Sequence, residues 1–457
     1  MKTRFGGMPL LALVLLAAGC DLFQVSLADY LREFPQELRL TDIWATHNGI
    51  DFRPLEPFEP GRNSFTIVVT PAAGIGIALQ AAANGASTAA CPVPWLIPPR
   101  STQQVNSYLS YNSYRSDQTE SITVTAANGA SMTYAVKIIW AKLITNPDEI
   151  RGGLDQDYYL KPGLSPIALP GNWVPVGTAA VPFKGSLRGN GTVITMHSIA
   201  PVLPVDAGSQ GLFGCIEDAV VEDLSIRLDG VGTNAAHSGG LAGTSSKSLI
   251  QRVRVSGALN QAYTGGTSAN SGGIAGTLDD KAAIYNCVST VTVSGSAAAL
   301  PASSFYMGGV AGNEVYTSGG YIINTCASGN VTASSPATVG GITGGGGYSP
   351  NHATPNSSIE GCVVISGTLD SGGGRVDYIL GQWDGPTTGG AINLNDQNYY
   401  LYTTGKSGSS EAPGNRITGT AKTEAELKTQ TTYTGLGWAF PAVWKMGASG
   451  YPALWWE

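Results

Sequence analysis

The chain has 457 residues and a formal net charge of −7 at pH 7, and only 12% of its residues are charged. The negative charge argues against a nucleic-acid partner, because phosphate backbones are bound by clustered lysines and arginines. Glycine occupies 61 positions, which favours short strands joined by tight turns over long helices. With 6 cysteines the chain is not a disulfide-stapled scaffold, and its length gives room for two or three domains.

The N-terminus has the pattern of an export signal. Lys2 and Arg4 precede an apolar run over residues 8–18, which is shorter than the roughly 20 residues that a membrane-spanning helix needs. The run ends in Leu16-Ala17-Ala18-Gly19-Cys20, which resembles the lipobox of bacterial lipoproteins, although Ala17 stands where leucine is commoner. The resemblance implies cleavage before Cys20 and attachment of lipid to its thiol. An ordinary signal peptide followed by a chance cysteine is the alternative interpretation.

These features predict a lipoprotein signal peptide over residues 1–19 and a lipidated tether over residues 20–36. No later stretch of the sequence is long and apolar enough to be expected to span a membrane as a helix. We therefore expect a membrane partner only through lipid on Cys20, and a location in the cell envelope, at the outer membrane or the cell surface.

Residues 37–142 have the alternating pattern of half-buried strands, and Asn128-Gly129 is a strong hairpin signal between two such stretches. Residues 120–139 resemble the last hairpin of bacterial cadherin-like β-sandwich domains, and Asn63–Val69 resembles an earlier strand of those domains. The resemblance breaks at residues 90–111. It implies an Ig/cadherin-like β-sandwich that serves as a spacer or interaction module. No cluster of acidic residues in this stretch of sequence suggests a Ca²⁺ site.

The rest of the chain contains an internal repeat. Four near-copies of one phrase recur every 32 to 36 residues: Gly239-Gly-Leu-Ala-Gly243, Gly272-Gly-Ile-Ala-Gly276, Gly308-Gly-Val-Ala-Gly312 and Gly340-Gly-Ile-Thr-Gly344. Each copy is followed by a strand-like phrase, beginning at Ile250, Ile284, Ile323 and Ile359. A repeat of this length cannot bury an apolar side alone, so we expect stacked coils of a parallel β-solenoid. A β-propeller is the competing architecture.

The glycine-rich phrase resembles the GLUG motif of bacterial surface proteins, which include the non-catalytic parts of IgA-cleaving metallopeptidases. Trp173-Val-Pro-Val-Gly177 before the repeats and Tyr451-Pro-Ala-Leu-Trp455 after them resemble the usual entry and ending of such solenoids. The resemblance implies an all-β protein in which residues 143–435 form a right-handed parallel β-helix. Residues 436–457 are then expected to cap an open end of the solenoid, where strand edges are otherwise exposed.

Three cysteines invite a metal interpretation, because Cys287, Cys326 and Cys362 recur 39 and 36 residues apart. A shared position in successive repeats predicts a row of small, inward-facing side chains. Zinc instead needs ligands that converge in tetrahedral geometry. We therefore expect neither a metal nor a cofactor. The sequence leaves open whether Cys91 and Cys215 form a disulfide.

The sequence offers few catalytic candidates. It contains neither His-Glu-x-x-His nor Gly-x-Ser-x-Gly. Glu222-Asp223, and Asp279-Asp280 with Lys281, are the nearest approach to the carboxylate group of a polysaccharide-cleaving β-helix. Both groups lie beside apolar phrases, as polar turn residues do, so no enzyme activity is expected.

Aromatic residues between the repeat phrases are candidates for binding or for covering the ends of coils: Phe305, Tyr306, Tyr316, Tyr321 and Tyr348. The sequence therefore predicts an adhesion or binding lipoprotein with an extracellular protein or glycan as its ligand. A polysaccharide-degrading enzyme and a purely structural envelope component are the alternatives.

Overall fold

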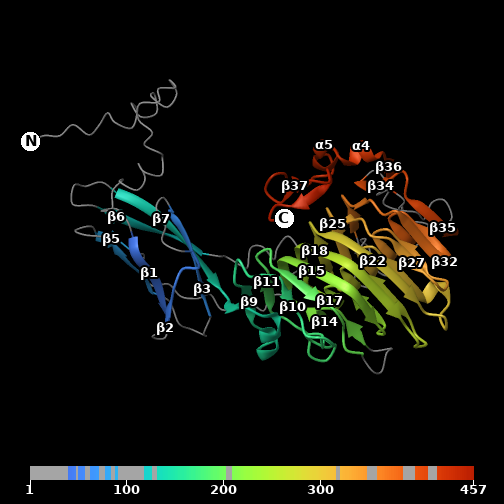
Figure 1. Cartoon of the computed structure of the whole chain (residues 1–457), viewed down its shortest axis with the longest axis horizontal. Coiled ribbons are helices and arrows are strands. Elements are labelled where there is room, and N and C mark those ends of the chain that lie inside the picture. Colours follow the sequence, from blue (N-terminus) through green and yellow to red (C-terminus); the bar gives the residue numbers. More distant parts are fainter. Residues whose placement is uncertain are drawn as a thin grey trace, which may run out of the picture. The chain divides into compact units, whose positions relative to one another are not determined.

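The computed structural model describes residues 40–47, 50–56, 62–70, 78–83, 88–90, 118–125, 131–201, 208–314, 320–346, 358–383, 397–409 and 419–457. The described residues fall into two compact units, one ending at Ile139 and the other running from Trp140 to Glu457. Figure 1 labels strands of both units where there is room. The predicted signal peptide, the tether, Cys20, Cys91, Tyr316 and Tyr348 lie outside the described residues. None of the helices among the described residues is long and apolar enough to cross a membrane.

The first unit contains two small sheets. One consists of β1 (Leu40–His47), β2 (Ile50–Phe52) and β4 (Ala78–Ala83), and the other of β3 (Ser64–Val69), β5 (Thr88–Ala90), β6 (Gln118–Thr125) and β7 (Ser131–Trp140). Strands β6 and β7 pair antiparallel from Gln118 opposite Ile138 to Thr125 opposite Ser131, as predicted for the hairpin. Tyr134, Val136 and Ile138 are buried at every second position of β7, which is the period of a strand with one face in a core. The packing of the two sheets as a sandwich stays a prediction.

The second unit is dominated by two long sheets, and every pairing described within them is parallel (Figure 1). The six-stranded sheet contains β14 (Phe213–Glu217), β17 (Ala242–Ser246), β20 (Ala275–Asp279), β24 (Ala311–Glu314), β29 (Thr343–Gly346) and β33 (Leu380–Trp383).

The 23-stranded sheet continues around the coils. Its strands are β8 (Lys142–Ile144), β9 (Asp157–Leu160), β10 (Ile167–Ala168), β11 (Ser186–Arg188), β12 (Val193–Met196), β13 (Ser209–Gln210), β15 (Val220–Thr233), β16 (His237–Gly239), β18 (Leu249–Ala262), β19 (Ala269–Gly272), β21 (Ala282–Tyr285), β22 (Val288–Ser296), β23 (Phe305–Gly308), β25 (Gly320–Ile323), β26 (Cys326–Ala327), β27 (Val331–Ala333), β28 (Thr338–Gly340), β30 (Ser358–Glu360), β31 (Val363–Val364), β32 (Thr368–Asp377), β34 (Tyr399–Leu401), β35 (Gly405–Ser409) and β36 (Thr420–Lys422).

The register of these strands follows the sequence repeat. Ala242 pairs with Ala275, Ala275 with Ala311, and Ala311 with Thr343. The apolar residue of each glycine-rich phrase is fully buried in one continuous core. These residues are Leu241, Ile274, Val310 and Ile342. Each coil therefore buries its apolar side against the next, which is consistent with the predicted parallel β-solenoid.

The glycines of the repeat lie where the chain turns sharply between the two sheets. A Cβ at Gly272 would lie 2.1 Å from the carbonyl oxygen of Ala275, and one at Gly308 would lie 1.9 Å from that of Ala311. Distances this short are not compatible with a side chain, because the atoms met belong to the backbone of the same turn. The phrase recurs because each coil makes the same tight corner.

The C-terminal segment contains the helices α4 (Glu424–Leu427) and α5 (Gln430–Thr434) and the antiparallel pair β37 (Trp444–Met446) and β38 (Pro452–Leu454). The short 3₁₀ helices η2 (Pro147–Gly152) and η4 (Ala302–Ser304) lie earlier in the unit. Residues 436–457 are predicted to cover an end of the solenoid. In the structure, buried residues of this segment pack against Val288, Cys326 and Val363, which are register partners in successive coils. The covering of an open end stays a prediction.

Candidate functional site

One corner of the solenoid carries a row of residues in the left-handed backbone conformation. Asp223, Arg252, Asn286 and Asn324 have φ angles of 53°, 50°, 54° and 50°, and Gly361 follows at 64°. The residues that precede them are register partners in successive coils, from Glu222 and Gln251 to Tyr285, Ile323 and Glu360. Asp, Asn and Gly tolerate this conformation better than other residues. Arg252 is the exception, and its side chain lies in the network described next.

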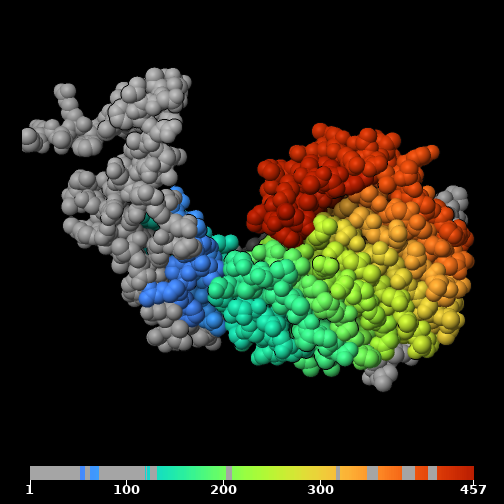
Figure 2. Space-filling model, viewed as in Figure 1, coloured from blue at the N-terminus to red at the C-terminus, as the bar shows by residue number. Residues whose placement is uncertain are grey.

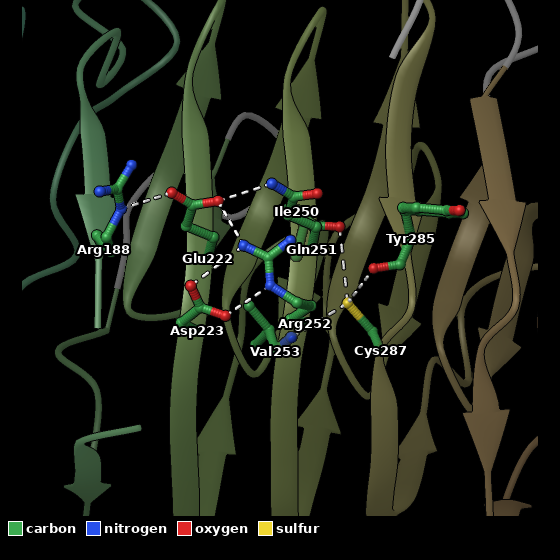
Figure 3. A network of polar contacts seen from close by, with 9 residues as sticks. All are labelled: Arg188, Glu222, Asp223, Ile250, Gln251, Arg252, Val253, Tyr285 and Cys287. Carbon is green, nitrogen blue, oxygen red and sulfur yellow. Dashed lines mark hydrogen bonds and ion pairs between the residues drawn. The ribbon is translucent and has the colours of Figure 1, made fainter. Parts of the chain in front are cut away.

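Glu222 is the centre of a polar network at this corner (Figure 3). Arg188 Nε donates to Glu222 Oε1 at 2.8 Å, and Gln251 Nε2 donates to Glu222 Oε2 at 2.7 Å. Arg252 binds both acidic residues, with a guanidinium nitrogen 2.8 Å from Glu222 Oε2 and Nε 2.6 Å from Asp223 Oδ1. The predicted pair Glu222-Asp223 is therefore held by two arginines that come from the coils on either side.

The network is partly withdrawn from solvent, since the exposed fraction of the side chain is 7% for Glu222, 14% for Arg188 and 21% for Arg252. Burial, the largest single influence, lowers the pKa of Arg252, but hydrogen bonding and charge attraction from Asp223 and Glu222 together raise it above its ordinary value. A guanidinium in this setting stays charged. Each carboxylate accordingly faces a permanent positive charge in a hydrogen-bonded geometry.

This geometry determines what the two carboxylates can do. Glycoside cleavage by a carboxyl pair needs one group that holds a proton and a second that is free to act as base or nucleophile. Here both groups accept hydrogen bonds from arginine, and one oxygen of Glu222 also accepts from Gln251. The arrangement neutralises charge between stacked strands.

The second acidic candidate lies at a different corner. Asp218, Lys247 and Asp280 form their own row of left-handed residues, with φ angles of 49°, 49° and 45°. Lys247 Nζ lies 3.0 Å from Asp280 Oδ2 and 3.8 Å from Glu217 Oε1. Opposite charges therefore alternate from coil to coil along this edge. Asp280 and Lys281 are turn residues, as the sequence indicates.

The prediction that three cysteines form an inward-facing row is wrong for Cys326. Cys287 and Cys362 lie in the main core, whereas Cys326 pairs with Val288 and Val363 and belongs to the cluster beneath the C-terminal segment. The strand register matches Ile284 to Ile322, one residue earlier than the repeat phrases suggest. Because strand side chains alternate between faces, this single-residue shift moves Cys326 to the other side of the wall.

The described cysteines are free and buried thiols. Cys287 Sγ lies 3.6 Å from the carbonyl oxygen of Ile250 (Figure 3) and accepts a hydrogen bond from the backbone N–H of Val253 at 3.4 Å. Burial raises the pKa of Cys287 and of Cys326 to about 12. These thiols are therefore protonated at neutral pH. Among the described residues no group of three or more His, Cys, Asp or Glu side chains is arranged to hold a metal.

The aromatic candidates divide between core and surface. Phe305 is fully buried in the main core, so it cannot contact a ligand. Tyr321 packs against Val220, Leu249 and Ala283 on the outer side of the wall. Tyr306 is half-buried and its hydroxyl donates to the carbonyl oxygen of Ser303 at 2.6 Å. Among the described residues, the most exposed large apolar side chain is that of Tyr402 at 72%, and the sequence did not mark it as a candidate.

The sequence interpretation also missed Arg188, Gln251 and Arg252. The repeat pattern could have indicated the contact between Gln251 and Glu222, because each of these residues follows the buried branched residue of its own repeat phrase. Aligning Val221 with Ile250 therefore places them opposite each other. The buried acid Glu314 at the end of β24 was missed as well. No repeat phrase marks it, since its register partner Leu278 is apolar.

No protein-family model matches the chain, and no curated protein is similar enough to indicate a relationship. The resemblances to lipoproteins, cadherin-like domains and GLUG solenoids therefore depend on the residues quoted for them.

Proposed function

We propose that the chain is a lipid-anchored, non-enzymatic binding protein of the cell envelope that presents its solenoid to an extracellular protein or glycan. In this proposal Cys20 carries the lipid, residues 37–142 form a cadherin-like β-sandwich that acts as a spacer, and residues 143–435 form a right-handed GLUG-type β-helix. The outer membrane or the cell surface is the location.

The proposal that the protein is not an enzyme depends on how the best catalytic candidates are paired. Glu222 and Asp223 are bound by Arg188 and Arg252 at 2.6 to 2.8 Å, which leaves neither carboxylate as a free base. Asp280 is likewise paired with Lys247. Acidic residues that neutralise arginines and lysines from neighbouring coils support a structural role, and thereby favour binding over hydrolysis.

The anchoring part depends on Cys20 and the apolar run before it. Protease shaving of intact cells, with a tag at the C-terminus, tests the location directly. Loss of the tag without lysis supports a surface-exposed binding protein. Survival of the tag until the envelope is opened contradicts it and favours a structural or scaffolding component that faces the periplasm.

The binding part is tested with the full chain released from the membrane by detergent. Incubation with arrays of glycans and of surface proteins measures capture, and incubation with soluble polysaccharides measures the release of fragments. Retention of a ligand without fragments supports the proposal. Fragment release by the unmodified chain would contradict the proposal and favour the polysaccharide-degrading alternative.

A further inference from the structure

The last described segment of the chain, residues 423–457, forms what we term the C-terminal clasp. It follows β36 (Thr420–Lys422), a strand of the last coil, and it turns back over coils that precede it in the sequence. Figure 2 shows this red segment lying over the green and yellow part of the same unit.

The clasp makes contacts in reverse order along the solenoid. Trp438 Nε1 donates to the carbonyl oxygen of Gly361 at 2.7 Å. Trp444 Nε1 then donates to Asn286 Oδ1 at 3.2 Å, across 158 residues of sequence. At its end Glu457 accepts from Arg254 at 2.9 Å, across 203 residues. As the clasp advances, the residues it meets lie earlier and earlier in the chain.

Apolar side chains fill the space between these anchors. Buried Tyr433, Trp438 and Trp444 pack over Val288, Cys326 and Val363. Those three wall residues are register partners in successive coils, so they form one continuous apolar row. The ring centroids of Trp438 and Trp444 lie 4.2 Å apart, and those of Tyr433 and Trp438 lie 4.9 Å apart. One cluster of mutually tilted aromatic rings therefore covers several coils at once.

In an uninterrupted solenoid each coil contacts only its neighbours, so coils can unfold in steps. The clasp breaks that rule, because it binds Arg254 in β18 and Gly361, directly after β30, through one short segment. We propose that the C-terminal clasp is a conformational lock, which couples the coils that it crosses into one cooperative unit and shields the Cys326 thiol while it is closed. The proposal is independent of the ligand and of the membrane anchor.

Cysteines at several levels of the solenoid make the lock measurable in the full chain. Cys287 and Cys362 lie in the core with 0% exposure, and Cys326 lies under the clasp with 4% exposure. Labelling with a maleimide along a denaturant gradient, followed by peptide mass mapping, reports the opening of each position. In the unmodified chain we expect the three thiols to become reactive at one common denaturant concentration.

The test variant is Trp438→Ala with Trp444→Ala, and the matched control is Trp455→Ala, whose side chain is 54% exposed. In the test variant we expect Cys326 to react at least roughly tenfold faster without denaturant, because the clasp opens locally. The midpoints for Cys287 and Cys362 should then separate. The control should behave as the unmodified chain.

Two results would overturn the proposal: separate midpoints in the unmodified chain, or a Cys326 in the test variant that reacts no faster than Cys287. If the double variant fails to fold, the single variant Trp444→Phe tests the proposal in its place. That variant keeps an aromatic ring and loses the hydrogen bond to Asn286. Selective acceleration at Cys326 in Trp444→Phe supports the lock, and unchanged labelling contradicts it.

Discussion

The glycine at the start of each repeat phrase offers a sharp test of how the coils are packed. At Gly272 a methyl group would meet the carbonyl oxygen of Ala275 at 2.1 Å, the Cα of Ala311 at 2.6 Å and the backbone nitrogen of Gly312 at 2.6 Å. The atoms belong to the backbone of the turn itself and of the next coil. They cannot give way as a flexible side chain would, so Gly272→Ala must displace one coil relative to the other.

Overpacking of an ordinary core costs about 1–3 kcal/mol. Because every atom met at Gly272 is backbone, we expect a loss at or above the top of that range, about 3 kcal/mol or more. Gly232→Ala is the matched control. Gly232 lies in β15, and a methyl group at this position would meet no atom within 4 Å beyond its chain neighbours. Replacing it should stabilise the chain by about 0.4–1 kcal/mol, because alanine restricts the unfolded state.

Urea unfolding followed by far-UV circular dichroism measures both variants against the unmodified chain. The expected difference between Gly272→Ala and Gly232→Ala is about 3.4–4 kcal/mol or more, the sum of the two effects. A difference below about 0.5 kcal/mol, within ordinary surface effects, would show that the glycine phrase is not required by close approach of the coils.

Three further outcomes are expected. Glu222→Ala should destabilise the chain by about 3 kcal/mol in urea unfolding, because Arg188 and Arg252 lose a partly buried partner; a loss below about 1 kcal/mol contradicts this. Burial raises the pKa of Glu314 well above 4.5, so the folded state holds its proton more tightly than the unfolded state and stability falls as pH rises. Glu314→Gln should therefore unfold at higher urea than the unmodified chain above about pH 5, with the gap closing below it. Cys20→Ser should abolish incorporation of labelled fatty acid and partitioning into detergent, and persistence of both refutes lipid attachment at Cys20.

The sequence was most informative where one physical requirement recurs in every coil. The glycine-rich phrases and their apolar residues Leu241, Ile274, Val310 and Ile342 predicted stacked parallel strands, and the structure has them in register in one core. The corner network was predicted only in part. Glu222 and Asp223 were recognised as turn residues, but their arginine partners come from neighbouring coils, and only the strand register reveals them.

What the amino-acid order determined by itself was therefore the period, the glycine corners and the inward-facing apolar positions, because each depends on contacts that repeat locally from coil to coil. Tertiary structure alone decided the one-residue register shift that turns Cys326 outward and the return of residues 423–457 along the wall. Both outcomes depend on which distant surfaces fit together. The contact of Trp444 with Asn286 spans 158 residues, and no local pattern in either segment encodes it.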